Sequence, residues 1–330
     1  MIDSPELELV GLYVYSDAKA GRDAGEIARR PSTGVVATRD REEILRLDAD
    51  VVIHTPRIQM PYQRHDADIC AILASGKNVV TTVGHHYPHA HGEERAATFL
   101  DAAHSGSTTM FGVGVNPGVI GERVATALSG AMFDLDSIGI TELVDTRKMP
   151  DPDFVFNVMG MGRDPDDLRQ VNGEHAALYG MLYSETLAFM ADALGIENYT
   201  IEPDHQVLPA TADIVMAAGV IAEGTVASTE WRWHLKSAGE TRITLAVIWT
   251  MEPERPEYVG QPHWSLTFHG RPGLRVSIDL VEPPPSEVRT RASQYITAAT
   301  VVRAVPAVVA APPGILRTET FLPYDARMSP

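Results

Sequence analysis

The sequence predicts an α/β protein, with a doubly wound parallel sheet in its N-terminal part and an inserted α+β domain with a mixed or antiparallel sheet. Two observations predict it. Up to about residue 120, short runs suited to strands alternate with helical runs, as in proteins with parallel sheets. From there to about residue 290, long runs of alternating polar and apolar residues predominate, as in antiparallel sheets.

The first strand is predicted at residues 7–16. Its apolar run is nearly continuous and consists of Leu7, Leu9, Val10, Leu12 and Val14. Such a run is typical of a parallel strand that is buried on both faces. A strand of this kind needs a neighbour on each side, so a further strand is expected before it.

Three helix–strand units follow between residues 42 and 118. Glycine ends the helical run in two of them, at Gly76 and Gly106. The strands are expected to end near His54, Val83 and Phe111. Alternating helices and strands imply right-handed crossovers and a parallel sheet with helices on both faces.

The inserted part begins with a helix next to Pro117 and Gly118 and contains a long helix that ends at Gly195. Four alternating runs predict an antiparallel meander, at residues 226–235, 240–251, 263–270 and 274–280. A last helix, stopped by Pro312-Pro313-Gly314, is long enough to return to the first domain. The predicted domains are therefore residues 1–122, 123–290 and 291–330.

Composition narrows the class of partner. The formal net charge is -17, and no dense Lys/Arg cluster offsets it, so nucleic acid and anionic membranes are disfavoured and a small-molecule substrate is expected. Cys70 is the single cysteine, which excludes an intrachain disulfide. No apolar run approaches the roughly 18 residues of a membrane helix. A cytoplasmic protein is expected.

A glycine-rich turn at residues 112–118 is the first candidate site. It follows a strand and precedes a helix, but its G-x-G-x-x-x-G spacing differs from the dinucleotide fingerprint, and Pro117 lacks a backbone N–H. The turn suits a close approach of the backbone to a flat ligand. Asn116 would supply one donor and one acceptor there, and the alternative is a purely structural turn.

Polar residues follow the first predicted strand, where a doubly wound sheet places the ribose of a dinucleotide. Ser16, Lys19 and Arg22 lie just past its end. They would bind a ribose hydroxyl or a 2'-phosphate, and the alternative is ordinary polarity at the surface. Because position 16 holds no acid, NADP is permitted as well as NAD.

Four histidines lie in the loop after the strand that ends near Val83, namely His85, His86, His89 and His91. Their spacing does not favour a metal site, and no cysteine lies nearby. Open α/β sheets bind ligands at the carboxyl ends of their strands. His85 and His86 are therefore candidates for proton transfer near neutral pH, and the alternative is that they are exposed loop residues.

Two tryptophans share one face of a predicted strand. Trp231 and Trp233 are two positions apart, so both point to the same side of the sheet. Packing in the core is their expected role, and a hydrophobic wall for the substrate is the alternative.

Five stretches taken in order carry a resemblance: residues 5–28, 48–56, 75–84, 112–130 and 304–315. They resemble the dihydrodipicolinate reductase-like NAD(P) oxidoreductases, and within them the branch of 2,4-diaminopentanoate dehydrogenase and the native amine dehydrogenases. GVGVNPG and APPG are the most specific of the matching motifs. The resemblance implies a Rossmann-like N-terminal domain, an inserted domain that binds substrate and forms a homodimer, a returning C-terminal helix, and NADP or NAD as cofactor.

The sequence departs from this family in two places. Family members begin with a further strand and a G-x-G-x-x-G turn that this sequence lacks, which predicts weakened cofactor binding. The amine dehydrogenases also carry a glutamate just after the strand equivalent to residues 78–83. Here that place reads Gly-His-His, so His85 or His86 is expected to stand in for it.

The resulting prediction is an oxidoreductase that transfers hydride between nicotinamide and a C=N or C=O carbon of a small substrate, most specifically in reductive amination of a ketone or aldehyde. His85, His86 and Asn116 are the predicted catalytic residues. The residues predicted to hold the edge of the nicotinamide are Thr82, Gly84, Asn116 and Gly118, and Thr55 and Pro56 are further predicted cofactor-binding residues. Two alternatives stay open: a non-catalytic degenerate Rossmann protein that binds a small ligand or partner, and a gene product that starts earlier.

Overall fold

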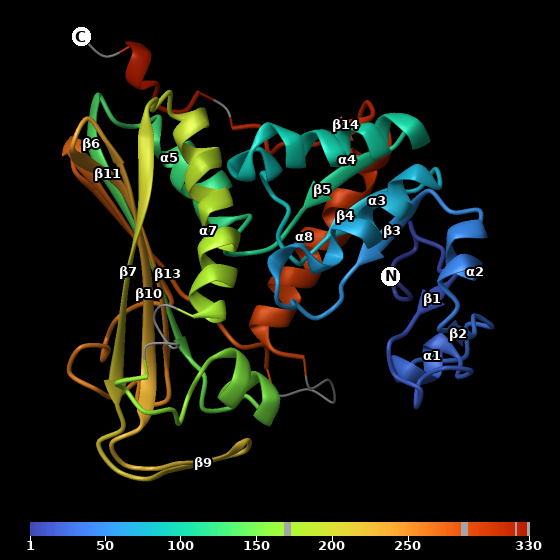
Figure 1. Ribbon diagram of the computed structural model, residues 1–330, viewed down its shortest axis with the longest axis horizontal. Coiled ribbons are helices and arrows are strands. Elements are labelled where there is room, and N and C mark those ends of the chain that lie inside the picture. Colours follow the sequence, from blue (N-terminus) through green and yellow to red (C-terminus); the bar gives the residue numbers. More distant parts are fainter. Residues whose placement is uncertain (168–172, 285–289, 321, 329–330) are drawn as a thin grey trace.

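The computed structural model describes residues 1–167, 173–284, 290–320 and 322–328. It has a helix-covered set of parallel strands on one side and a six-stranded sheet on the other, with helix α7 between them (Figure 1). This arrangement confirms the α/β fold class. No helix in the described ranges combines the length and the apolar character needed to span a bilayer.

The helices and strands of the N-terminal part follow the predicted alternation. They are β1 (Leu12–Tyr13), α1 (Ala24–Ile27), β2 (Ala37–Thr38), α2 (Arg41–Arg46), β3 (Val51–His54), α3 (Asp66–Ala74), β4 (Asn78–Thr81), α4 (Glu93–Gly106) and β5 (Thr109–Gly112), with short 3-10 helices at Tyr62–His65 and Pro88–His91.

The main parallel sheet has the order β14-β5-β4-β3, in which β14 (Gly314–Ile315) follows the C-terminal helix α8 (Ala292–Ala310). On one face the core includes Phe99, and on the other Val305 of α8 packs against the sheet. Helix α8 thus packs against the parallel sheet of the N-terminal part. Strand β14 was not predicted, because two residues carry no periodic pattern.

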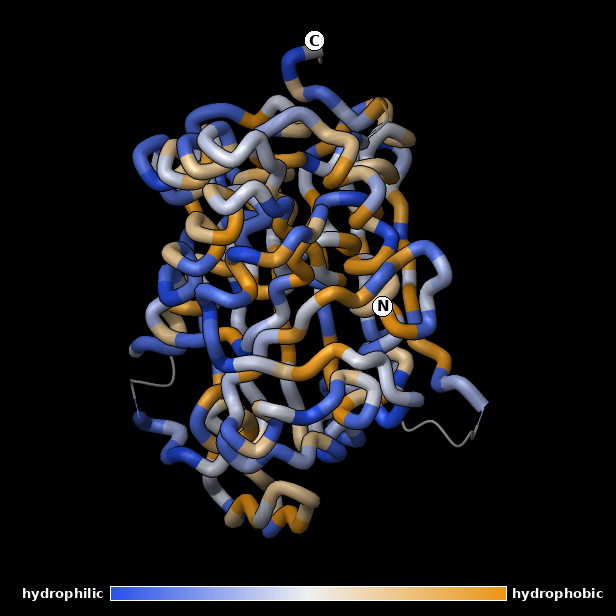
Figure 2. The backbone as a smooth tube through the Cα atoms, turned by 90° about the vertical axis from the view of Figure 1, so that its right-hand side faces the viewer, coloured by the Kyte–Doolittle hydropathy of each residue, from blue (hydrophilic) through white to orange (hydrophobic). Residues whose placement is uncertain are grey.

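The first strand differs from its prediction. Only β1 is extended enough to pair, and it forms a separate two-stranded parallel sheet with β2. Val10 is 42% exposed and Tyr13 is 37% exposed, so the prediction of burial on both faces is wrong here. A strand is buried on both faces only where packed elements cover both sides of its sheet, whereas β1 lies in a small two-stranded sheet with α2 packed against it. Figure 2 shows hydrophobic stretches of chain on this side of the molecule, near the N-terminus.

The second sheet has the order β13-β12-β6-β11-β10-β7. Its strands are β6 (Asp134–Asp145), β7 (Tyr199–Pro209), β10 (Val226–Ser237), β11 (Glu240–Thr250), β12 (Trp264–Arg271) and β13 (Leu274–Ile278), and a small hairpin of β8 (Ile214–Met216) and β9 (Gly219–Ile221) lies apart. β6 lies between β11 and β12, parallel to the first and antiparallel to the second. The mixed sheet and the antiparallel pairs β10–β11 and β12–β13 are confirmed. The continuous meander is wrong, because β6 separates β11 from β12 and polar alternation predicts strands but not their order.

Helix α7 (Glu174–Ala193) covers one face of this sheet (Figure 1). Tyr179 packs on Trp231 and Tyr183 on Trp233, with ring centroids 5.2 and 4.8 Å apart, and both tryptophans are 2% exposed. Their predicted role in packing is confirmed. Gly195 follows the helix in the left-handed region, as expected of a residue that ends a helix.

The glycine-rich turn leads into a π-helical turn at Ile120–Ala125, followed by α5 (Thr126–Ser129). A second π-helical turn, Asp153–Val158, lies between β6 and α7, and a 3-10 turn at Ala326–Met328 comes near the C-terminus. α7 packs against both the 120–125 turn and the 88–91 turn. The helix therefore meets the carboxyl ends of β4 and β5.

Candidate active site

A buried carboxylate from α7 lies at the centre of the site. The Glu185 side chain is fully buried. Its Oε1 accepts a hydrogen bond from the Tyr62 hydroxyl at 2.9 Å and lies 3.0 Å from Nε2 of His91, while its Oε2 accepts from the backbone N–H of Tyr87 at 3.1 Å. Two segments, around Tyr62 and at residues 87–91, are thus joined to one acid on α7.

The groups around Glu185 keep its carboxylate ionised. Burial alone would raise the pKa of Glu185, but the hydrogen bond from His91 and the electrostatic attraction of the carboxylate to His85, His91 and His86 outweigh burial and lower the pKa to about 2. The carboxylate is therefore ionised at neutral pH. It adds a fixed negative charge beside the loop of four histidines.

His85 is fully buried, and both of its ring nitrogens and one face of its ring contact other groups of the protein. Its ring stacks on Tyr62 with centroids 5.3 Å apart, Nε2 lies 2.8 Å from the Asp66 carboxylate, and Nδ1 lies 3.2 Å from the carbonyl oxygen of Val83. Arg95 binds the same carboxylate at 3.0 Å. With both ring nitrogens facing protein acceptors, His85 positions the loop rather than offering an atom to a substrate.

His86 has a different setting. It is 7% exposed, and no hydrogen bond to its ring is found within the described part of the chain. A Cβ built on Gly114 would lie 3.6 Å from Cε1 of His86, so the ring lies beside the glycine-rich turn. Burial lowers the pKa of His86, and the charges of Glu122 and Glu185 oppose this in part. A neutral imidazole, able to accept a proton, is therefore present at neutral pH.

Asn116 links the turn to the six-stranded sheet. Its Nδ2 donates a hydrogen bond to Oε2 of Glu142 at 2.7 Å. Its Oδ1 is buried and has no protein partner, which leaves one acceptor available to a ligand. Glu142 is 13% exposed, and its other oxygen lies 3.7 Å from Nε2 of His263.

The nearby glycines shape the turns. Gly84 has a φ of +87°, and a Cβ there would collide with the Tyr62 hydroxyl. Gly118 has a φ of +122°, and a Cβ there would lie 2.6 Å from the carbonyl oxygen of Gly114. Its N–H donates to Oε2 of Glu122 at 2.8 Å. Both positions require glycine because protein atoms already fill the space.

The other predicted cofactor residues divide into two groups. Thr55 and Pro56 follow β3, and Thr82 follows β4. The backbone N–H of Thr82 donates a hydrogen bond to the carbonyl oxygen of His54 at 3.1 Å. These three residues therefore lie at the same carboxyl edge of the sheet as His86. Ser16, Lys19 and Arg22 are exposed after β1, and Arg22 forms an ion pair with Glu26. No contact in the described ranges joins this second group to Glu185.

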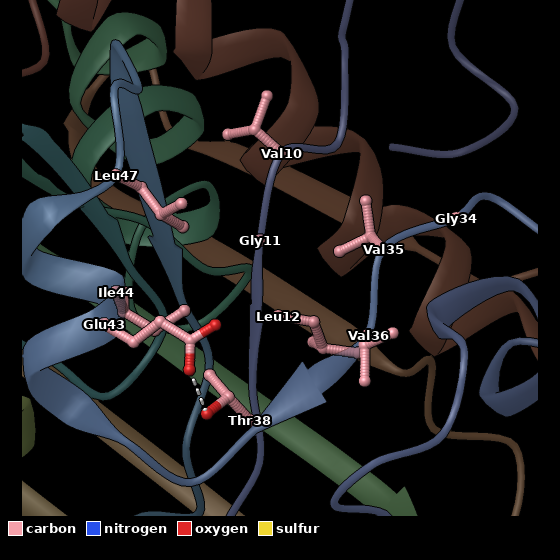
Figure 3. Close-up of a pocket in the computed structure, with 10 residues that line it drawn as sticks. All are labelled: Val10, Gly11, Leu12, Gly34, Val35, Val36, Thr38, Glu43, Ile44 and Leu47. Carbon is pink, nitrogen blue, oxygen red and sulfur yellow. Dashed lines mark hydrogen bonds between the residues drawn. The ribbon is translucent and has the colours of Figure 1, made fainter.

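A cavity of about 250 Å³ lies elsewhere, between β1 and α2 (Figure 3). The residues that line it include Leu12, Ile44 and Leu47, and the Glu43 carboxylate accepts from the Thr38 hydroxyl at 2.7 Å. It borders residues 10–12 rather than the end of the first strand. It is therefore separate from the predicted ribose-binding residues.

Sequence reasoning missed several residues of this site. Glu185, Tyr62, Asp66, Arg95 and Glu122 have no motif of their own. One signal was available for Glu185, since it is an acid within a strongly apolar helical run, LYSETLAFMA. A charged residue on a buried helix face needs partners, and such a residue often belongs to a functional site.

Comparison with known proteins finds similarity to amine dehydrogenases in both sequence and fold. No family model matches the sequence. The chain is 27% identical over 322 residues to an amine dehydrogenase from Streptomyces virginiae, covering 94% of this chain and 88% of that protein. Its fold matches the structure of amine dehydrogenase from Mycobacterium smegmatis with a TM-score of 0.73 at 20% identity, over 93% of this chain and 87% of that one. The chain is thus a homologue of amine dehydrogenase along nearly its whole length and has that enzyme's fold.

Proposed function

We propose that this protein is an NAD(P)-dependent oxidoreductase of the amine dehydrogenase type, acting on a C=N or C=O carbon of a small substrate. The observation that carries the proposal is the neutral His86 beside the glycine-rich turn, in a chain homologous to an amine dehydrogenase. Residues 1–122 would bind the cofactor, and residues 123–290 would complete the substrate site. The wider dihydrodipicolinate reductase-like grouping stays a prediction.

The residues at the sheet edge fit the nicotinamide half of the cofactor. The unpartnered buried Oδ1 of Asn116 is an acceptor that a carboxamide N–H would satisfy. Thr55, Pro56 and Thr82 lie at the ends of the neighbouring strands. NADP or NAD would supply or accept the hydride when bound. Ser16, Lys19 and Arg22 stay the proposed contacts to the ribose end.

Two groups of this chain would act on the substrate. His86 would hold or move the proton at the substrate nitrogen or oxygen, because its ring is neutral and has no described hydrogen-bond partner. Glu142 is partly accessible and would stabilise a cationic amine or iminium through its negative charge. Glu142 would thus take the place of the glutamate that the family carries after the strand equivalent to β4.

The six-stranded sheet offers a surface for a homodimer. α7 covers one face of the sheet, and the other face carries no helix in Figure 1. We therefore propose that two copies pair through that face. Light scattering of the purified chain tests this, since a mass of one chain at micromolar concentration would contradict it.

Cofactor binding is the first test of the function. Titration of the chain with NADPH and NADH, followed by nicotinamide fluorescence, should give saturable binding. Asn116→Ala removes the proposed acceptor and should weaken binding about tenfold, the loss expected for one hydrogen bond of about 1.4 kcal/mol. Gln261→Ala, at an exposed position, should leave binding unchanged.

The outcomes separate the alternatives. Binding that Asn116→Ala does not alter would contradict the placement of the nicotinamide. Binding with no turnover of any amine, ketone or aldehyde would favour the non-catalytic alternative. Binding absent up to millimolar concentration would count against the cofactor assignment for this chain.

A further inference from the structure

A group of side chains that could ligate a metal ion lies where β3 ends and α3 begins. His54, His65 and Asp68 each offer a ligand atom, and these atoms lie within 4.8 Å of one another. The two imidazole rings meet edge to face with centroids 5.5 Å apart. His54 is 7% exposed and His65 is 3% exposed, while Asp68 is partly buried. The proposed reaction uses none of these three residues.

The hydrogen bonds of the two rings leave one nitrogen of each for a ligand. Nε2 of His65 lies 3.0 Å from the carbonyl oxygen of Arg57, and because a carbonyl only accepts, Nε2 carries the proton and Nδ1 keeps its lone pair. Nδ1 of His54 lies 3.0 Å from the Thr81 hydroxyl. A histidine that binds a metal typically uses its other nitrogen in just this way, on a carbonyl or a similar acceptor.

An unpartnered atom within this group points to a missing ligand. Nε2 of His54 is buried and has no hydrogen-bond partner. Leaving such a nitrogen unpaired is unfavourable, so buried polar atoms almost always have a partner. Asp68 binds Arg41 through Oδ1 at 2.7 Å, which leaves its other oxygen for coordination. The three side chains thus offer two nitrogens and one oxygen.

We propose that His54, His65 and Asp68 bind one divalent transition-metal ion of the zinc class, with water as a fourth ligand. Imidazole nitrogen with a single carboxylate suits zinc, cobalt, nickel or iron rather than calcium or magnesium, which prefer oxygen ligands. Zinc bonds of about 2.0 Å place tetrahedral ligands about 3.3 Å apart, so the side chains close in by rotation as the ion binds.

Such an ion would connect the end of β3 to the start of α3. The intervening residues 55–65 include Thr55 and Pro56, so binding would stiffen the segment that carries these two predicted cofactor contacts. The metal site does not depend on the proposed enzymatic function. A chain without dehydrogenase activity would still bind the ion.

The test is metal binding by the whole chain, freed of metal by a chelator. Zn²⁺ would be titrated in competition with a chromophoric chelator, and Co²⁺ would be followed by its visible absorption, which is intense in tetrahedral sites. We expect one ion per chain with a Kd at or below the micromolar range. Asp68→Asn and His65→Gln should each weaken binding at least tenfold, and His104→Ala, at an exposed position on α4, should not alter it.

Folding is checked in the same samples. Far-ultraviolet circular dichroism should show each variant folded, and one equivalent of Zn²⁺ should raise the melting temperature of the unaltered chain but not that of Asp68→Asn. The proposal would be overturned if the chain bound no Zn²⁺ at concentrations up to about 100 µM. Binding that both Asp68→Asn and His65→Gln leave unchanged, or that is lost on His89→Ala instead, would also overturn it.

Discussion

Replacing Glu185 by glutamine should lower the free energy of unfolding by about 3 kcal/mol, because loss of one partner from a buried charged network leaves the others unpaired. Two hydrogen-bond donors, from Tyr62 and Tyr87, point at the carboxylate, and His91 lies beside it. The amide of glutamine would turn an N–H toward one of these groups. Urea unfolding at pH 7 measures the difference.

The matched control is Glu197→Gln, the same chemical change at an exposed position after α7. It should alter the free energy of unfolding by less than about 0.5 kcal/mol. A Glu185→Gln variant as stable as this control would show that the network around Glu185 contributes nothing to the fold.

The pH dependence of the same two proteins gives an independent check. Glu185 has its pKa lowered from 4.5 to about 2, so its ionised form stabilises the folded state above about pH 4.5, and this contribution is lost as pH falls from there toward 2. The stability difference between the unaltered chain and Glu185→Gln should therefore shrink between pH 5 and pH 3. A constant difference over that range would mean that the charge of Glu185 is not the cause.

Replacing His86 by glutamine should reduce kcat about 10²- to 10⁴-fold, the usual contribution of a proton-transferring side chain. Glutamine keeps a polar group of similar size but cannot take up a proton at neutral pH. Steady-state oxidation of NADPH or NADH with ammonia and a panel of ketones and aldehydes measures it. Affinity for the nicotinamide cofactor should change by no more than about threefold.

A pH profile distinguishes this role from a purely structural one. Burial lowers the pKa of His86 from its ordinary 6.5. Because the imidazole becomes protonated as pH decreases through this lowered pKa, kcat/KM of the unaltered chain should fall on the acid side of it. His86→Gln should lack this acid limb. His104→Gln should keep both kcat and the limb, and an unaltered kcat in His86→Gln would exclude His86 from proton transfer.

The sequence was sufficient where structure depends on local periodicity. The helices α3, α4, α7 and α8 and the strands β3, β4 and β5 lie close to where they were expected, because apolar spacing and glycine positions act within a few residues. The order of the six-stranded sheet was not predictable in the same way. β6 inserts between strands that follow it by about 100 residues, and alternation carries no information on such pairing.

The candidate site, like the fold, was predictable from the sequence only in part. The sequence by itself determined that a polar loop with His85 and His86, and a glycine-rich turn with Asn116, come together at the carboxyl ends of two parallel strands. Only the tertiary structure decided that Glu185 accepts a hydrogen bond from Tyr62, 123 residues away. It also decided that both ring nitrogens of His85 have protein partners, while the ring of His86 has no described hydrogen bond. The reason is physical: a strand's direction fixes where its loops emerge, but the charge and availability of a side chain depend on groups that only the packing of α7 brings near.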